Sequence, residues 1–219
     1  MPIASPTPNA LPSRARFSRC LDEATRQAVL RFQRENWLID DGIAGDCTFN
    51  ALRDMESYVV LHSVRLVTQP DNTTCWAAAT AMLLGRGGIV QAPPFMLNAR
   101  GELLNDSELN DGAVTSRFAA YFHLRLYPPQ TWLPSALAGV LRRGPIMCNV
   151  LWKAGDYTHG LGSESHWAVF AGIRGDGTGP GTTLRLYDPL PPPQGGIRSV
   201  NYGLLIRNLP ALTYQILQA

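Results

Sequence analysis

Residues 69–85 have the sequence QPDNTTCWAAATAMLLG, a polar turn followed by a run of small and apolar residues. Ala77 through Leu84 are good helix residues, and Gly85 or Gly87 can end the helix. Four polar residues ahead of the run have side chains that can cap its N-terminus: Asp71, Asn72, Thr73 and Thr74. The stretch therefore predicts a helix that carries Cys75 in its first turn.

Cys75 has two interpretations, a small buried apolar residue or the nucleophile of an enzyme. A free thiol has a pKa of about 8.5, so a nucleophile needs help to form the thiolate near neutral pH. A helix N-terminus provides such help, because its unpaired N–H groups and its dipole favour negative charge. Cys20, Cys47 and Cys148 form neither a CxxC pair nor a Cys/His metal spacing, so we expect reduced, buried cysteines and no metal site.

The composition is that of an ordinary globular protein. Of 219 residues, 45% are hydrophobic and 16% are charged, and the net charge of +2 is spread without long runs. The chain therefore lacks the clustered charge that is typical of proteins that bind nucleic acid or a membrane surface. No apolar run has the roughly 18 residues that span a bilayer. The first 17 residues contain prolines where a signal peptide needs an apolar segment. We therefore expect synthesis in the cytoplasm without a Sec signal peptide, and delivery outside the producing cell by a specialised secretion system or lysis.

Residues 1–57 are predicted to form a flexible lead, residues 1–17, and a small helical module. Residues 21–38 contain helix formers with a buried stripe at Val29, Leu30 and Phe32. An Asp41-Gly42 turn follows, and Asp46 can start a helix that ends at Leu52.

The stretch FQRENWLIDDGIAGDCTFNAL, residues 32–52, resembles the peptidoglycan-binding-like module of bacterial cell-wall hydrolases. The matching residues are Phe32, Gln33, Leu38, Asp41, Gly42, Gly45, Thr48 and Leu52. We expect Gly42 and Gly45 to serve the tight turn, with Leu38, Ile43 and Leu52 closing a small core. Wall binding by this half-module is what the resemblance implies.

From residue 58 to residue 219 the pattern predicts one larger α+β domain, with a helix packed on an antiparallel sheet. Helices are expected at residues 75–84, 113–124 and 133–144. Strand-like or extended runs are found at residues 58–67, 145–152, 166–173, 182–189, 203–208 and 212–217.

The histidine that heads one predicted strand can be paired with an aspartate by counting along a hairpin. If the Gly-rich residues 174–180 connect two antiparallel strands, residues 173 and 181 pair and His166 opposes Asp188. Directly opposed residues share a face of the sheet, so these two side chains can hydrogen-bond as a base and its orienting group. A strand-end histidine and a turn-forming Asp-Pro are the structural alternative.

Other polar residues give weaker signals. Gln69 lies six residues before Cys75, and its amide N–H can donate to an oxyanion in the same cavity. His62 lies in a connecting segment, His123 within a helical pattern, and His159 in a Gly/Ser loop, so none is the expected base.

Together, Q-x5-CWAA, HWAVFAGI and YDP resemble the papain-like cysteine peptidases over roughly residues 60–215. The similar bacterial groups are the AvrRpt2-like one and the compact C39-like one with its G-P-I…H-W…G…D-P order. The resemblance implies a papain-like fold and four roles: Cys75 as nucleophile, His166 as general base and acid, Asp188 as orienting residue and Gln69 as oxyanion donor. Trp76 and Trp167 are expected beside the substrate. Trp167 is a departure, because many relatives have a small residue there, and the domain is shorter than plant and animal papains.

The implied reaction is hydrolysis of an amide through a thioester, with no metal or organic cofactor. One hypothesis joins the two modules in an effector or lysin that cuts peptidoglycan peptides, with a possible cognate immunity or inhibitor protein as partner. The alternative is a protease effector that cleaves proteins inside a target cell. A catalytically inactive binding module is the non-enzymatic alternative, and an N-terminal pro-segment that covers the cleft is a further possibility.

Overall fold

A seven-stranded antiparallel sheet forms the centre of the computed structural model, which describes residues 22–104, 109, 112–152, 164–208 and 214–219. The strands are β1 Tyr58–Leu61, β2 Arg125–Gln130, β3 Ile146–Trp152, β4 Glu164–Gly175, β5 Thr182–Asp188, β6 Gly196–Asn201 and β7 Tyr214–Gln218. Their order is β2-β7-β3-β4-β5-β6, and β1 pairs with β4 outside this path. The α+β class and the antiparallel sheet predicted from the sequence are confirmed.

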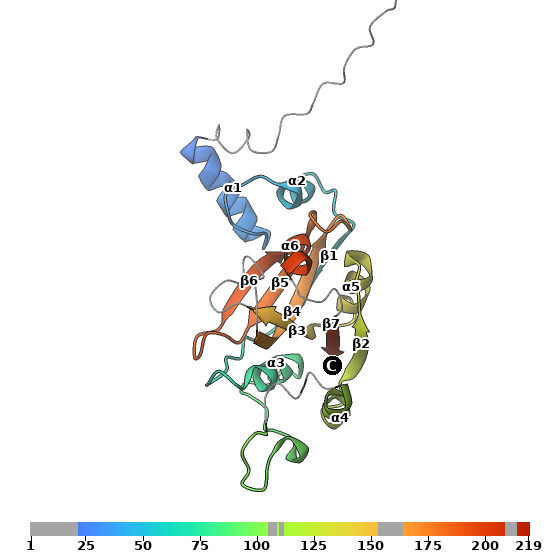
Figure 1. Ribbon diagram of the computed structural model, residues 1–219. Coiled ribbons are helices and arrows are strands. Elements are labelled where there is room, and N and C mark those ends of the chain that lie inside the picture. The colour runs from blue at the N-terminus through green and yellow to red at the C-terminus, as the bar shows by residue number, and fades with distance from the viewer. Residues whose placement is uncertain (1–21, 105–108, 110–111, 153–163, 209–213) are drawn as a thin grey trace, which may run out of the picture.

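Helices cover both faces of the sheet. They are α1 Glu23–Glu35, α2 Asp46–Leu52, α3 Cys75–Leu83, the 3₁₀-helix η2 Pro94–Met96, α4 Gly112–Tyr121, α5 Pro134–Leu141 and α6 Tyr202–Asn208. One face packs against α3 and α4 through Met147, Val169 and Leu217. The other packs against α5 and α6 through Cys148 and Phe170. Two apolar cores therefore sandwich one sheet, and α1 and α2 lie at the opposite end of the molecule from α3 and α4 (Figure 1).

Every residue of α3 is buried, from Cys75 to Leu83. The helix contains four alanines, and such small side chains let a helix lie close against a sheet. Trp76 and Met82 fill the space around them, both at most 3% exposed. The small side chains of α3 therefore determine how closely the Cys75 end of the helix approaches strands β3 and β4.

The hairpin β4–β5 differs from the sequence prediction in register. Residue 173 was predicted to pair with residue 181, but Ile173 pairs with Leu184. The strands run closer to the turn than expected, because the Asp176 carboxylate accepts hydrogen bonds from the N–H and hydroxyl of Thr178 and closes the connection. A bulge between Phe170 and Gly172 then shifts the register by one residue.

The shifted register makes the predicted direct opposition of His166 and Asp188 wrong. Val169 pairs with Tyr187, so Asp188 comes opposite Ala168, two residues from His166. Residues two apart in a strand share a face, and diagonal neighbours are still within reach of long side chains. His166 and Asp188 therefore face each other as diagonal neighbours, and the single-residue bulge keeps them on one face.

Gly172 lets β1 join β4 beside this bulge. A Cβ on Gly172 would lie 2.7 Å from the backbone oxygen of Val60 and 2.8 Å from a methyl carbon of Leu61. Only glycine permits this close approach. The beginning of β4 thus pairs with β3 and its end with β1, on the same edge of the strand.

One strand prediction is wrong, and two strands were missed. Residues 203–208 were expected to be extended, but Tyr202–Asn208 form helix α6, and Asn201 accepts a hydrogen bond from Leu204 N at its start. Strands β2 and β6 were not predicted at all. Strand β2 contains Pro128 and Pro129, which a sheet tolerates here because β2 is an edge strand with an irregular register.

The helical part of the N-terminal segment forms as predicted at α1 and α2, but its small core differs. Ile43 is 53% exposed and Leu52 is 60% exposed, so only Leu38 of the three predicted residues is buried. A polar centre replaces them: the Gln33 amide donates to Asp41, the Ile43 carbonyl and Thr48, and accepts from Gly42 N. Gly42 has a φ of 73°, as the predicted tight turn requires.

This segment is docked on the sheet through buried polar contacts. Arg174 of β4 pairs with Glu56 at 2.6 Å, both side chains less than 10% exposed, and also donates to the Asn36 carbonyl. Asn50 donates to Asp176 at 2.8 Å. These contacts lie at the end of β4 remote from His166, so residues 22–57 do not cover the Cys75 region.

Candidate active site

Cys75 is the first residue of α3 and is 3% exposed. Thr74 precedes it without a side-chain cap, and the N–H groups of Cys75 and Trp76 make no hydrogen bond to the backbone of a described residue. Such N–H groups and the helix dipole favour a negative charge on the sulfur. Trp167 N also donates to Cys75 Sγ at 3.5 Å. The sequence prediction that Cys75 lies in the first turn of a helix is therefore met.

His166 and Asp188 form a buried hydrogen-bonded pair. His166 Nε2 lies 2.8 Å from Asp188 Oδ1, and the side chains are 5% and 0% exposed. Leu190 N donates to the same Asp188 oxygen at 2.9 Å, which fixes the carboxylate. Because Nε2 is engaged with Asp188, the other ring nitrogen, Nδ1, is left for the sulfur of Cys75.

The pKa of His166 is raised from 6.5 to about 9. Burial of the ring lowers this pKa, since it disfavours the charged form. The hydrogen bond to Asp188, the hydrogen bond to Cys75 and the charges on both partners raise it by more. His166 is thus held in its protonated, imidazolium form at neutral pH.

Gln69 is completely buried beside this group. Its backbone N–H donates to the carbonyl of Pro189, the residue after Asp188, at 3.2 Å, and its side-chain Nε2 donates to the carbonyl of Asp71. The side-chain oxygen is buried and has no hydrogen bond among the residues described. Gln69 therefore connects the turn before Cys75 to the end of the strand that carries Asp188.

Asp71 organises the turn that leads into α3. Its Oδ1 accepts from the N–H and hydroxyl of Thr73, at 2.8 and 2.9 Å, and from the hydroxyl of Thr74 at 2.9 Å. Burial raises the pKa of the Asp71 carboxyl, but these hydrogen bonds outweigh it and lower the pKa below 3.8. From the sequence Asp71 was expected only as a possible helix cap, but an Asp side chain also commonly bonds the backbone two residues further on, as it does here with Thr73.

Trp76 and Trp167, predicted to contact substrate, are both 1% exposed. Trp76 packs edge-on against Phe118, with ring centroids 5.8 Å apart. The α3 helix and the sheet enclose both indole rings, because large rings fill the space that the alanines of α3 leave. Their role as substrate contacts stays a prediction that this burial does not favour.

The remaining cysteines and histidines that the structure describes show no comparable constellation. Cys148 is fully buried, which raises its pKa well above 9, and Cys47 also has a raised pKa through burial. His62 bonds the carbonyl of Leu141. Cys20 and His159 lie outside the described residues. Two hydrogen-bond donors of the site could not be predicted from the residue types. They are the backbone N–H groups of Trp167 and Leu190, and every residue except proline has such a group.

Within the described ranges, no group of three or more His, Cys, Asp or Glu side chains is arranged to hold a metal ion. None of the helices found there has the length and apolar character to cross a membrane.

Comparison with known proteins adds one finding. The family model described as papain-like cysteine protease AvrRpt2 matches residues 57–201, more than half of the chain. No curated protein and no solved structure was found to match. The matched range contains the α3 turn and the strands β4 and β5 that carry the cysteine, the histidine and the aspartate. The chain therefore belongs to the AvrRpt2 family of papain-like cysteine proteases.

Proposed function

We propose that Cys75, His166 and Asp188 are the catalytic triad of this protease and that Gln69 is its oxyanion donor. The observation that supports this most is the raised pKa of His166, which results from Asp188 on one side and Cys75 on the other. A buried histidine whose pKa is raised by two neighbouring groups is typical of catalytic sites.

The chemistry follows from these roles. The Cys75 thiolate attacks the amide carbonyl, and the C–S bond forms as negative charge moves to the carbonyl oxygen. The second N–H of the Gln69 amide and the free N–H groups of the first turn of α3 stabilise that oxygen. The imidazolium of His166 gives its proton to the leaving nitrogen as the C–N bond breaks. Neutral His166 then takes a proton from water, which attacks the thioester and releases Cys75.

The substrate class that fits best is a polypeptide, as in a protease effector that acts on proteins. The family supports cysteine protease activity on peptide bonds. The peptidoglycan alternative depends on the N-terminal segment, since the pattern of residues 32–52 is what resembles a wall-binding module. In the structure, Trp37 of that segment is engaged with the sheet: its carbonyl accepts from Ser199, and Arg174 stacks on its ring. The Trp37 ring face and carbonyl that dock on the sheet are therefore not available for wall binding.

Three expectations from the sequence remain secondary proposals. They are delivery by a specialised secretion system or lysis, an immunity or inhibitor partner, and an inactive binding module. The last conflicts with the presence of all four catalytic residue types around one buried sulfur.

Two digests test the proposed substrate class. The purified chain and its Cys75→Ala variant are incubated separately with an unfolded protein, such as casein, and with purified peptidoglycan, and the products are analysed by mass spectrometry. We expect casein fragments from the unaltered chain only, and no released muropeptides. Muropeptide release with intact casein contradicts the protein substrate and favours the peptidoglycan peptide.

A further inference from the structure

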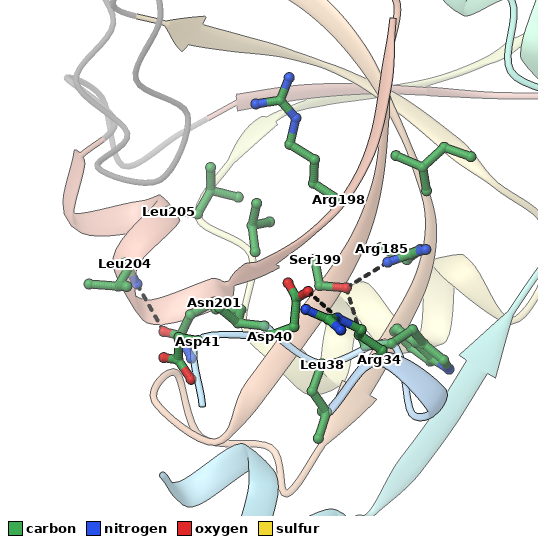
Figure 2. Close-up of a pocket in the computed structure, with 14 residues that line it drawn as sticks. Arg34, Leu38, Asp40, Asp41, Arg185, Arg198, Ser199, Asn201, Leu204 and Leu205 are labelled. Atoms are coloured by element: carbon green, nitrogen blue, oxygen red, sulfur yellow. Dashed lines mark hydrogen bonds and ion pairs between the residues drawn. The ribbon is translucent and has the colours of Figure 1, made fainter. Parts of the chain in front are cut away.

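A second concave site lies on the far side of β5 from β4. It is a pocket of about 490 Å³ between the α1–α2 connection, strand β6 and helix α6. Figure 2 shows Arg34 and Asp40, Ser199 of β6, and Leu204 and Leu205 of α6 gathered around it. None of these residues has a role in the chemistry proposed above.

The pocket opens along the edge of a strand. Five consecutive residues of β6 line it, Ile197 to Asn201. Successive side chains of a strand point to opposite faces. Ser199 donates to the Trp37 carbonyl of the α1–α2 connection, whereas Val200 packs in the core that contains Leu205 of α6, so the lining comes from both faces and the cavity passes round the outer edge of β6.

No further strand lies beside that edge among the described residues. Strand β6 is last in the order of the sheet and pairs only with β5. Outside this pairing, Ile197, Ser199 and Val200 make no backbone hydrogen bond in the described part of the chain. Every second residue of an edge strand directs its N–H and C=O outward, which offers a template for another extended chain.

The charges that line the pocket favour an acidic ligand. Asp40 is paired with Arg34 at 2.9 Å, and Asp41 accepts from Gln33 and from Ile43 N. Arg185 donates to the hydroxyl of Ser199 at 2.9 Å and makes no ion pair with a described residue. Its guanidinium has five donors, so donors remain for a carboxylate.

The edge also begins next to the catalytic group. Asp188 pairs with Gly196, the residue before Ile197. Strands are spaced by roughly 4.8 Å, so a chain added to β6 lies about 14 Å to the side of β4. Arg185 pairs with Gly172, six residues along β4 from His166, which adds roughly 20 Å along the strand, so about seven or eight extended residues span the two sites. A polypeptide bound at Cys75 can therefore reach the groove with a neighbouring segment.

We propose that the groove along β6 is an exosite that binds an extended, acidic segment of the protein substrate by strand addition. Main-chain hydrogen bonds to β6 give the affinity, and Arg185 selects a carboxylate side chain. The assignment of the occupant as substrate depends on the function proposed above, whereas binding of the peptide does not.

Peptide binding tests the groove without turnover. The full chain with Cys75→Ala is titrated with a fluorescein-labelled octapeptide of alternating Thr and Val that carries one central Glu, and anisotropy is measured. We expect the same peptide with Lys in place of Glu, or with alternate backbone amides methylated, to bind at least about tenfold more weakly. Equal binding of the methylated peptide overturns strand addition. Because only the peptide is changed, this test does not depend on the folding of a variant in the groove.

Two variants test the role of Arg185. Arg185→Gln is expected to weaken binding of the Glu peptide about tenfold. Arg100→Gln removes an exposed arginine from a distant loop and is expected to leave binding unchanged. Equal affinity of the two variants contradicts the role of Arg185.

Casein digestion by the active chain tests whether the occupant is substrate. We expect Arg185→Gln to raise KM with little change in kcat, and to leave the rate of Cys75 alkylation by a small epoxide unchanged. Peptide binding with an unchanged KM overturns the assignment to substrate. Loss of Cys75 alkylation in the unaltered chain marks failure of the proposed catalytic site instead.

Discussion

The hydrogen bond between His166 and Asp188 helps to set the pH range in which His166 carries a proton. That proton is the one that His166 gives to the leaving nitrogen. The pKa of His166 is raised to about 9, so the imidazolium persists below that pH and is lost above it. We expect kcat/KM to fall on the alkaline side with an apparent pKa near 9. Asp188→Asn removes one cause of the raised pKa, so the fall should move to lower pH. A pH–rate profile with the exposed-site control Asp54→Asn checks this, and an identical alkaline limb in Asp188→Asn contradicts it.

Gln69 is expected to act on the rate of the chemical step. Removing one oxyanion donor typically lowers kcat by about 10²–10³-fold, because the donor stabilises charge that exists only in the transition state. We predict such a fall for Gln69→Ala with little change in KM. Gln91→Ala, at an exposed glutamine, is the control, and melting temperatures separate loss of catalysis from loss of fold. A normal kcat in folded Gln69→Ala refutes the role.

The sequence predicted the residues of the site better than their geometry. Cys75 at a helix start and His166 beside Asp188 follow from caps, turns and strand alternation. The orientation of Gln69 by the Asp71 carbonyl depends on a side-chain rotamer and a backbone group, which no residue pattern encodes. The burial of Trp76 and Trp167 depends on how closely the alanines of α3 let the helix approach the sheet.

At the scale of elements, the Arg174–Glu56 pair holds the α1–α2 segment against β4. Both side chains are less than 10% exposed, so removing one leaves a buried charge without its partner. We predict that Arg174→Met lowers the free energy of unfolding by about 3–5 kcal/mol. The double variant Arg174→Met/Glu56→Gln should recover part of this, since it leaves no unpaired charge.

Urea unfolding measures this effect against a matched surface pair. Arg26 pairs with Glu23 in α1, but these side chains are 47% and 68% exposed. Arg26→Met should therefore cost at most about 1 kcal/mol. Equal losses for the two single variants contradict a structural role for the buried pair.

Elements with a strong local pattern were predictable, and those decided by tertiary context were not. The helices α3, α4 and α5 and the strands β3, β4 and β5 follow from their sequences. The edge strand β2 contains two prolines that local rules exclude from a central strand. Helix α6 has the apolar run GLLIRN, which is compatible with strand or helix until its packing on β5 and β6 is known. The β4–β5 register was missed because the strands run closer to the turn that Asp176 closes than the residue pattern suggests, and a bulge then shifts the pairing by one residue. Neither feature has a reliable sequence signal.

For the whole molecule, residues 22–57 are predicted to stabilise the protease and not to inhibit it. They contact the end of β4 that is remote from His166. Deletion of residues 1–57 should lower the melting temperature, because it exposes Arg174 and the outer surface around β6, and should not raise kcat/KM. Activity assays and thermal unfolding of both chains check this. A shortened chain with higher activity and unchanged stability contradicts it and indicates a pro-segment.

Alkylation of Cys75 tests the central claim most directly. The purified chain is treated with a small thiol-reactive epoxide, and mass spectrometry of tryptic peptides gives the rate at each cysteine across the pH range. We predict rapid labelling of Cys75 near neutral pH, slow labelling of Cys47 and none of Cys148, because burial raises the pKa of the last two thiols. His166→Ala should abolish the fast reaction. Labelling of Cys75 that is absent, no faster than that of Cys47, or unaffected by His166→Ala contradicts the assignment of Cys75 as the nucleophile.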